Sequence, residues 1–278
     1  MINSLYVRGG AGTQNAALAA GGSAFPVYCQ ATEEYDGSSW SAGPNTINIK
    51  GYASYGGSQN AAWLAGGTAP SPTHLSCTEE YNGSSWSAGG NSAISRNNLA
   101  ACGTQTAGLG FGGYSPSVPG NTNATEEYDG STWTTGGNLN TARSGLAGTG
   151  IQTAGLAFGG GGPAPLLAIT EEYDGSTWTA GGNLNTARER LSGAGIQTAA
   201  LAFGGSIGPS TYTAVAEEYD GSVWTNTSSL PATFSHGGGA GTQTAGLAFG
   251  GRDPVNAVVN STYEYDGGGP ATLIIGTD

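Results

Sequence analysis

The chain has very little positive charge. Its 278 residues include one lysine, Lys50, and six arginines against 19 acidic residues, so the formal net charge is −12. A surface this acidic repels phosphate backbones and anionic lipid headgroups. The composition therefore argues against a nucleic-acid-binding protein and against charge-driven membrane binding.

Long apolar runs are also missing. No stretch approaches the roughly 18 apolar residues of a membrane-spanning helix, and residues 1–4 lack the basic and apolar regions of a signal peptide. We therefore expect no membrane insertion, and export would use another route, such as host-cell lysis with assembled particles. No segment has helical periodicity over a useful length, which leaves β-structure.

Cysteine and histidine are scarce. Cys29, Cys77 and Cys102 follow no metal-ligand spacing. Cys29 and Cys77 lie in equivalent loops of neighbouring repeats, so a disulfide is conceivable, but small buried or half-buried thiols are the preferred interpretation. The histidines are His74 and His236 alone, and such a pair is more often solvated or hydrogen-bonded than metal-bound. We expect no metal site and no cofactor.

What the chain does have is a repeat. A Gln, a Gly-Gly pair and a Glu-Tyr pair recur six times in the same order, with steps of 45 to 47 residues between Gly-Gly pairs. A period near 46 with β-type content predicts a propeller with one blade per repeat. Six repeats account for nearly all of the chain, so we expect residues 1–278 to form one six-bladed propeller. Trp follows the repeated Tyr by five residues at five places: Trp40, Trp86, Trp133, Trp178 and Trp224.

The fourth repeat shows how one blade is built. We expect four strands, a to d, at residues 143–149, 153–158, 170–173 and 176–179. Asp-Gly at 174–175 is a strong signal for a two-residue hairpin between strands c and d. Strands a and b are dominated by small residues, which fit near a propeller axis, while Trp and Tyr fill the wider gaps at the rim. The expected fold is all-β, with four-stranded antiparallel blades.

The two ends of the chain raise the question of how the ring closes. Each blade can be continuous, with no strand shared between the ends. Propellers also close by pairing both termini in one blade, and residues 1–7 could add a strand beside the apolar run at residues 271–275.

Four repeated sequence features resemble those of a known family of repeats. Gly-Gly ends strand b, Tyr-Asp ends strand c, Trp lies in strand d, and strand a of the next blade opens with Arg96, Arg143 or Arg188, with Lys50 in their place once. Together these features resemble the kelch repeat over the whole chain. The sequence departs from kelch in a Tyr-to-Trp gap that is one residue shorter, in Pro270 at the sixth Trp position, and in missing arginines in blades one and six.

The amino-acid sequence of the repeats is similar to that of kelch-type proteins encoded by marine bacteriophages. That resemblance implies a virion surface or fibre-associated protein, present in many copies on the outside of a particle, which binds a host glycan or receptor or other virion proteins. The alternative is a soluble or secreted carbohydrate-binding lectin. Quasi-equivalent sugar sites between blades would favour the lectin.

The repeated carboxylates do not point to catalysis. Every repeat carries acidic residues like Glu33, Glu34 and Asp36, and paired carboxylates can cleave glycosidic bonds. An enzyme needs one asymmetric cluster, however, so we expect these groups to pair with the repeated Arg and to satisfy backbone amides. The Asp-Gly-Ser-Thr-Trp turn is one residue short of a sialidase Asp-box, and the histidines are too few for the copper site of galactose oxidase. We expect no enzyme.

The tryptophans allow two interpretations. They could stack on sugars in grooves between blades, but packing at the rim is favoured. Trp63 stands where Gly or Ala is expected in strand b of blade two, and is either a core filler or a site marker.

The b–c loops differ between repeats while the strands do not. They span residues 23–30, 68–76, 114–123, 161–169, 206–215 and 252–261, and in such a propeller they emerge on one face. A rigid scaffold with variable loops is the usual layout of a recognition surface, although unconstrained loops also drift. The opposite face shows only uniform Gln and Asp-Gly turns. The partner-binding candidates on the loops are Phe25, Tyr28, His74, Tyr114, Leu166, Tyr212, Arg252 and Asp253.

Overall fold

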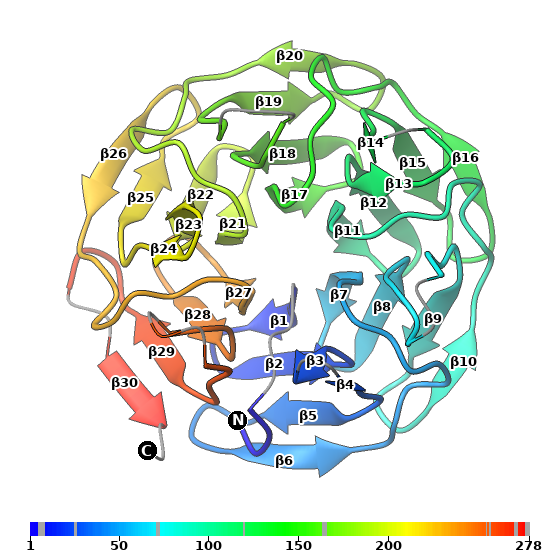
Figure 1. The fold of residues 1–278 in the computed structure, drawn as a ribbon, viewed down its shortest axis with the longest axis horizontal. Helices are drawn as coiled ribbons and strands as arrows, with labels where there is room; N and C mark the ends of the chain where they lie inside the picture. Colours follow the sequence, from blue (N-terminus) through cyan, green and yellow to red (C-terminus); the bar gives the residue numbers. More distant parts are fainter. Residues whose placement is uncertain are drawn as a thin grey trace.

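The structure is a computed structural model that describes residues 1–4, 9–24, 27–70, 73–118, 120–162, 166–253, 255, 257–269 and 272–275. Six four-stranded antiparallel sheets stand around a central axis, each radiating from the axis to the rim (Figure 1). The expected six-bladed β-propeller is confirmed. Among the described residues there is no helix with the length and apolarity to cross a membrane.

The blades follow one another along the chain, with strand a innermost and strand d at the rim. Blade one contains β1 (Ala11–Thr13), β2 (Ala16–Ala20), β5 (Thr32–Tyr35) and β6 (Trp40–Gly43). Blade two contains β7 (Ser54–Ser58), β8 (Ala61–Ala65), β9 (Thr78–Tyr81) and β10 (Trp86–Ala88). Blade three contains β11 (Ala100–Thr104), β12 (Ala107–Phe111), β15 (Thr125–Tyr128) and β16 (Trp133–Thr135).

The second half of the ring repeats this order. Blade four contains β17 (Ala147–Ile151), β18 (Ala154–Phe158), β19 (Thr170–Tyr173) and β20 (Trp178–Ala180). Blade five contains β21 (Ser192–Ile196), β22 (Ala199–Phe203), β25 (Ala216–Tyr219) and β26 (Trp224–Thr227). Blade six contains β27 (Gly238–Gly241), β28 (Gly246–Phe249), β29 (Thr262–Tyr265) and β30 (Thr272–Ile275). Three b–c loops form short hairpins, β3 (Ser23–Ala24) with β4 (Val27–Tyr28), β13 (Tyr114–Ser115) with β14 (Gly120–Asn121), and β23 (Ser206–Gly208) with β24 (Thr211–Tyr212).

The predicted Asp-Gly hairpin is wrong in its length. Tyr173 pairs with Trp178, so the c–d turn of blade four has four residues and strand d starts two residues later than expected. The cause is the Asp174 carboxylate, which accepts hydrogen bonds from the backbone N–H groups of Ser176 and Thr177, both at 2.8 Å. Asp side chains commonly organise turns in this way. These bonds, backbone N–H first, hold the pKa of the exposed Asp174 carboxyl at about 2.

Buried ion pairs join the segment before strand a to strand c within blades two to five. Arg96 and Glu126, with 2.8 Å between Nη2 and Oε2, are almost fully buried, and Arg96 also donates to the strand-end carbonyl of Ala124 at 2.8 Å. Burial lowers the pKa of Arg96 to about 10, which leaves its guanidinium protonated at neutral pH. The predicted pairing of repeated acids with repeated cations is thereby confirmed. The other three pairs are Lys50–Glu79, Arg143–Glu171 and Arg188–Glu217.

The repeated Tyr and Gln side chains join neighbouring blades. The hydroxyl of Tyr173 donates to Glu127 of the preceding blade at 2.6 Å, and Nε2 of Gln197 donates to the carbonyl of Tyr173 at 2.7 Å. Both kinds of bond occur at all six junctions, including the junction between blades six and one. The Gln amides on the opposite face are therefore used for assembly.

The repeated tryptophans lie between blades. Trp178 is 5% exposed and donates from Nε1 to Thr125 Oγ1 of the preceding blade at 2.9 Å. Trp40, Trp86, Trp133 and Trp224 make the equivalent bond, and of the five only Trp133 is half-buried rather than buried. Packing at the rim, rather than an exposed groove of indoles, is the arrangement found.

Trp63 is a core residue. Its side chain is fully buried, and it pairs with Gly56 and Glu80 in the register that Leu occupies in other blades. The expectation that it replaces Gly or Ala is therefore wrong. A Cβ on Gly56 would come within 2.6 Å of the Trp63 ring and one on Gly108 within 2.7 Å, so glycine in both neighbouring strands makes room for the indole.

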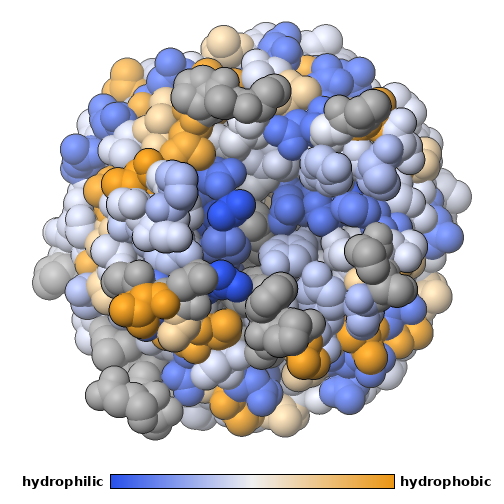
Figure 2. Space-filling view, viewed as in Figure 1, coloured by the Kyte–Doolittle hydropathy of each residue, from blue (hydrophilic) through white to orange (hydrophobic). Residues whose placement is uncertain are grey.

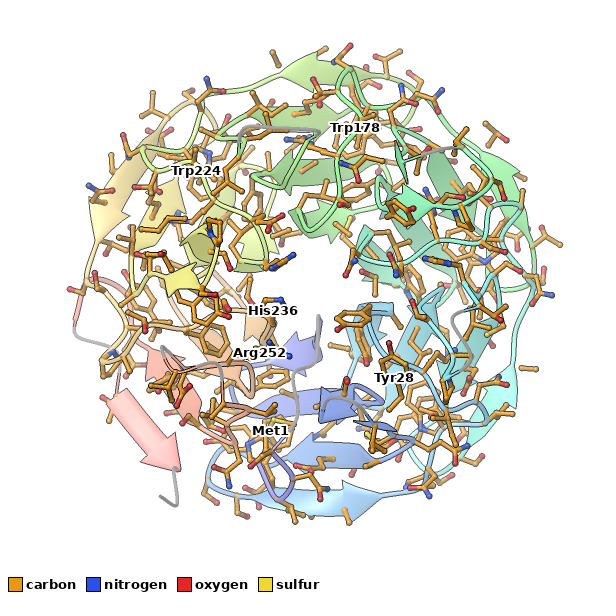
Figure 3. All side chains as sticks on the ribbon, viewed as in Figure 1. Met1, Tyr28, Trp178, Trp224, His236 and Arg252 are labelled. Carbon is orange, nitrogen blue, oxygen red and sulfur yellow. The ribbon has the colours of Figure 1, made fainter. Side chains whose placement is uncertain are left out.

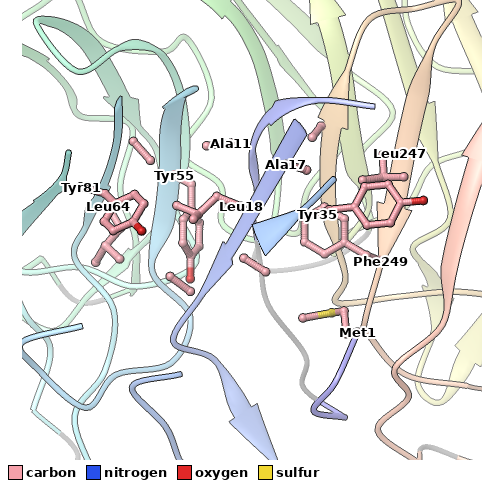
Figure 4. Close-up of a cluster of buried hydrophobic side chains, with 14 of the residues drawn as sticks. Met1, Ala11, Ala17, Leu18, Tyr35, Tyr55, Leu64, Tyr81, Leu247 and Phe249 are labelled. Atoms are coloured by element: carbon pink, nitrogen blue, oxygen red, sulfur yellow. The ribbon is translucent and has the colours of Figure 1, made fainter. Parts of the chain in front are cut away.

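The junction between blades six and one is closed without a shared strand. All strands of blade six come from the C-terminal part of the chain, residues 1–4 form no strand, and residues 5–8 and 271 lie outside the described part. Instead, the Met1 nitrogen donates to the Asn260 carbonyl at 2.7 Å, and the N–H groups of Ile2 and Asn3 donate to the Glu33 carboxylate at 2.8 and 2.9 Å. The linker that enters blade two makes the same bonds to blade one and to its own glutamate. Residues 1–3 thus act as a blade-to-blade linker, and Figure 4 shows Met1 at a core cluster that spans the closure.

Candidate binding face and axial mouth

The b–c loops of blades two to six are tied at their base to the segment that enters the same blade. Each of these loops starts with a residue that forms a backbone bridge with the segment preceding strand a of its own blade, at residues 68, 114, 161, 206 and 252. In blade three, for example, Tyr114 N donates to the Asn97 carbonyl at 2.8 Å, and Asn97 N donates back at 3.0 Å. Variation between loops is therefore carried on a fixed base.

The predicted partner-binding residues lie in different surroundings. Tyr114 is 41% exposed, whereas Tyr28, His74, Leu166, Tyr212, Arg252 and Asp253 are half-buried, and Phe25 lies outside the described residues. Asp253 accepts hydrogen bonds from the N–H groups of Val255 and Ala257 at 3.1 and 2.7 Å. Its carboxylate therefore organises its own loop.

Aromatic contacts join adjacent loops. The His74 and Tyr114 rings, from the loops of blades two and three, have centroids 5.5 Å apart. Tyr212 of blade five lies edge-on to His236 at 6.3 Å. Residues that the sequence places 40 or 24 positions apart thus meet on one face across a junction.

A ring of left-handed residues surrounds the axis on this face, directly before the innermost strands. Its five described members lie seven positions before the repeated Gln of blades two to six. The N–H of each member from blade three on donates to the carbonyl of the member in the preceding blade, from His236 to Arg190, Gly145, Asn98 and Tyr52 in turn, at 2.6 to 3.1 Å. The φ angles lie between 53° and 63°. We call this set the axial ring.

Side chains on the axial ring carry a cost. The left-handed conformation costs a non-glycine residue roughly 1–2 kcal/mol, and only Gly145 avoids that cost. The chain has 52 glycines, and among the described residues every positive-φ position outside this ring, except Ser210, is glycine. Strained residues of this kind cluster at functional sites. The axial ring thus carries four non-glycine residues, Tyr52, Asn98, Arg190 and His236, at positions where glycine would fit without strain.

Below the axial ring lies a narrow cavity on the axis. Its volume is about 160 Å³, and strand-a residues of all six blades line it, nearly all of them Gly, Ala, Ser or Thr. Such a lining offers few side chains for recognition, whereas the face above it is strongly hydrophilic around the central opening (Figure 2). The chemistry that can distinguish ligands therefore lies at the mouth.

Thiols and metal ligands contribute little to this face. Cys29, Cys77 and Cys102 are free, so the conceivable Cys29–Cys77 bridge is absent. Burial raises the pKa of Cys102 to about 12, which keeps this thiol protonated and unreactive. Within the described residues, no group of three or more His, Cys, Asp or Glu side chains is placed to hold a metal ion.

Comparison with known proteins adds no family. No protein-family model matches this chain, and no curated protein is similar to it. What the candidate face can bind therefore follows from its own geometry.

The sequence analysis did not predict the axial ring, and it predicted only that His236, like His74, is solvated or hydrogen-bonded rather than metal-bound. His236 Nδ1 does lie 2.8 Å from Ser235 Oγ, but its position on the ring is the more informative feature. A signal was present in the repeats, because the position seven before Gln is glycine in blade four. One glycine in such a column indicates a positive φ for all its members.

Proposed function

We propose that this propeller is a non-catalytic binding module, which recognises a host-surface glycan or another virion protein through its b–c loop face and forms part of the exterior of a bacteriophage particle. The observation that carries the binding role is the contrast between six nearly identical, internally bonded blades and loops that differ in every blade on a fixed base. Rigid scaffolds with such loops are the usual form of recognition proteins.

The repeat sequence supports the virion assignment, since it resembles the repeats of kelch-type proteins of marine bacteriophages. The repeated carboxylates support a non-catalytic role, because the first Glu of each pair is buried in an ion pair or linker contact and the second accepts a Tyr hydroxyl. A secreted lectin with equivalent sugar sites between blades is less favoured, because the five tryptophans that would line those sites lie between blades and donate to Thr.

The loop face is tested by paired serine variants. His74→Ser with Tyr114→Ser alters two adjacent loops, and Ile151→Ser with Ile196→Ser is the control, since both isoleucines are about half exposed at the opposite a–b turns (51% and 55%). The loop variant should lose binding to a glycan array or to purified virion proteins at unchanged thermal stability, and the control should keep it. Retained binding in the loop variant together with loss in the control would assign function to the opposite face.

The virion assignment needs its own experiment. Mass spectrometry and immunogold labelling of purified particles of the encoding virus should find the chain on the particle surface in many copies. A chain found only free in the lysate would favour the secreted lectin.

A further inference from the structure

Among the described residues of this acidic chain, the partly exposed cationic side chains lie at one junction. Four of its seven cationic side chains, Lys50, Arg96, Arg143 and Arg188, are buried in ion pairs, and Arg8 lies outside the described residues. The remaining two, Arg190 and Arg252, both belong to the b–c loop face between blades five and six.

Backbone hydrogen bonds hold these residues together. His236 N donates to the Arg190 carbonyl at 3.0 Å, and Ser235, next to His236, exchanges two hydrogen bonds with Arg252, at 3.3 and 2.8 Å. Figure 3 shows His236 and Arg252 side by side at the central opening. We call Arg190, Tyr212, His236 and Arg252 the axial patch.

Arg190 contributes a side chain that the fold does not need. Gly145 makes the same backbone bond in blade four, whereas Arg190 has a φ of 57° and a side chain that is 41% exposed. Its Nε lies 3.2 Å from Glu189, and among the described residues its two terminal nitrogens bond no protein group. A planar guanidinium with free terminal nitrogens is suited to the paired oxygens of a carboxylate or sulfate.

We propose that the axial patch binds the carboxylate or sulfate group of an acidic saccharide. This inference rests on the proposed function, since it names the ligand class for the same face. Arg190 and Arg252 supply the positive charge, and the Tyr212 and His236 rings, 6.3 Å apart, supply flat surfaces beside it for a sugar ring. Attraction to this patch is selective because the rest of a chain with a net charge of −12 repels anions.

An acidic peptide fits the patch less well. Peptides commonly add to an exposed strand edge, but the edges beside the patch are occupied, since Ser206 pairs with Glu189 and Arg252 pairs with Ser235. The nearby carboxylates also have partners, because Glu189 contacts Arg190 and Asp253 accepts two backbone N–H groups of its loop. A small, compact anion avoids both constraints.

The test is calorimetric titration of the chain with carboxylated and sulfated oligosaccharides, each paired with its neutral counterpart, such as trigalacturonate and its methyl ester. The acidic members should bind and the neutral members should bind at least about tenfold more weakly, the size expected for losing a charge-assisted hydrogen bond. Arg190→Gly and Arg252→Gln should each weaken binding of the acidic sugars to a similar extent, and Arg190→Lys should weaken it less.

Asn98→Gly is the matched control, because Asn98 lies on the same axial ring but not in the axial patch. Both glycine variants should raise the melting temperature, whereas only Arg190→Gly should lose the ligand. A loss of binding with a gain in stability separates recognition from a folding defect.

Three results would overturn the inference: no binding of any acidic saccharide, equal binding of acidic and neutral members, or tighter binding of a hexaglutamate peptide than of the acidic sugars. If a neutral glycan or a virion protein still binds through the loops of blades two and three, the proposed function stands while this inference fails. If serine substitution of those loops and both arginine variants leave all binding intact, both proposals fail.

Discussion

Phe234 and Tyr263 pack edge to face, with ring centroids 6.2 Å apart, at the two positions where blades two to five carry a buried cation and a glutamate. Both members of the ion pair are replaced together in blade six. A buried charge without its partner is strongly destabilising, whereas an apolar pair of similar volume is tolerated. Compared with blades two to five, blade six thus carries a paired substitution, with Phe234 in place of the cation and Tyr263 in place of the glutamate.

Blade six should therefore accept the ion pair only as a pair. We expect Phe234→Arg alone to lower the free energy of unfolding by about 3–5 kcal/mol, and Phe234→Arg with Tyr263→Glu to recover much of that loss. Chemical denaturation of the two single variants and the double variant gives the coupling energy. Additive effects of the two changes would contradict this account.

The tryptophans show a second paired substitution. The Thr that accepts the indole N–H of the next blade is Ala216 in blade five, and the sixth Trp position is Pro270. Donor and acceptor are absent together, so no buried hydroxyl loses its partner. In the same junction, the Phe203 and Phe234 ring centroids lie 6.4 Å apart, whereas in the equivalent place Phe158 packs at a tilt against Trp224, with ring centroids 4.9 Å apart.

Truncating these indoles should cost stability according to their burial. We expect Trp178→Ala to lower the free energy of unfolding by roughly 3–5 kcal/mol, and Trp133→Ala, which is half-buried, to fall at the lower end of that range. Urea unfolding monitored by circular dichroism measures both. Losses below about 1 kcal/mol at both sites would show that the indoles are not part of the packed junctions.

The fold could be predicted from the repeats because each repeated residue has one structural task. The Tyr, Gln and Trp that mark the period are the donors to the preceding blade. Their partners could not be predicted, because a period gives the position along the chain but not which blade a side chain reaches. The predicted length of the c–d turn was wrong for a related reason. Asp174-Gly175 alone fits two loop lengths, and the length depends on whether the Asp174 carboxylate accepts hydrogen bonds from the N–H groups of Ser176 and Thr177.

Of the axial patch, the variable b–c loops pointed to Tyr212 and Arg252 but not to Arg190 or His236, which lie before strand a. Arg190 and Arg252 are 62 residues apart in the sequence, and backbone bonds through His236 and Ser235 link them only because blade six follows blade five around the axis. Tyr52 and His236 do not by themselves indicate left-handed backbone, and the one mark in the column is Gly145 at the equivalent position of blade four.

The axial ring should show the strain directly. Tyr52→Gly and Asn98→Gly should each raise the free energy of unfolding by about 1 kcal/mol through relief of the left-handed strain, offset in part by the greater freedom of glycine in the unfolded chain. Gly145→Ala should lower it by a similar amount. Thermal melts of the three variants test the sign, and a destabilised Asn98→Gly would refute strain at this ring.

Stability should fall at alkaline pH because of the six junction tyrosines. Burial, and then the hydrogen bond to a glutamate, raise the pKa of Tyr173 and Tyr219 to about 12 and that of Tyr35, Tyr81, Tyr128 and Tyr265 in the same direction. The unfolded chain ionises near pH 10. The contribution of these groups is therefore complete below pH 10 and is lost as the pH rises from 10 towards 12.

Denaturation at pH 8 to 11.5, with phenolate absorbance recorded in parallel, measures this loss. Tyr173→Phe, which cannot ionise, should flatten the decline in proportion to one junction. Titration of all 13 tyrosines near pH 10 at unchanged stability would contradict the assignment.

The repeated Tyr, Gln and Trp side chains all donate between blades in one direction. Tyr and Gln of each blade, and Trp of blades one to five, donate to the preceding blade along the chain, and the ring lets blade one donate to blade six in the same way. Every blade therefore brings one set of donors for the blade before it and one set of acceptors for the blade after it. Gain or loss of a whole repeat leaves these sets balanced, so the number of blades is fixed not by hydrogen bonding but by how closely the innermost strands can pack around the axis.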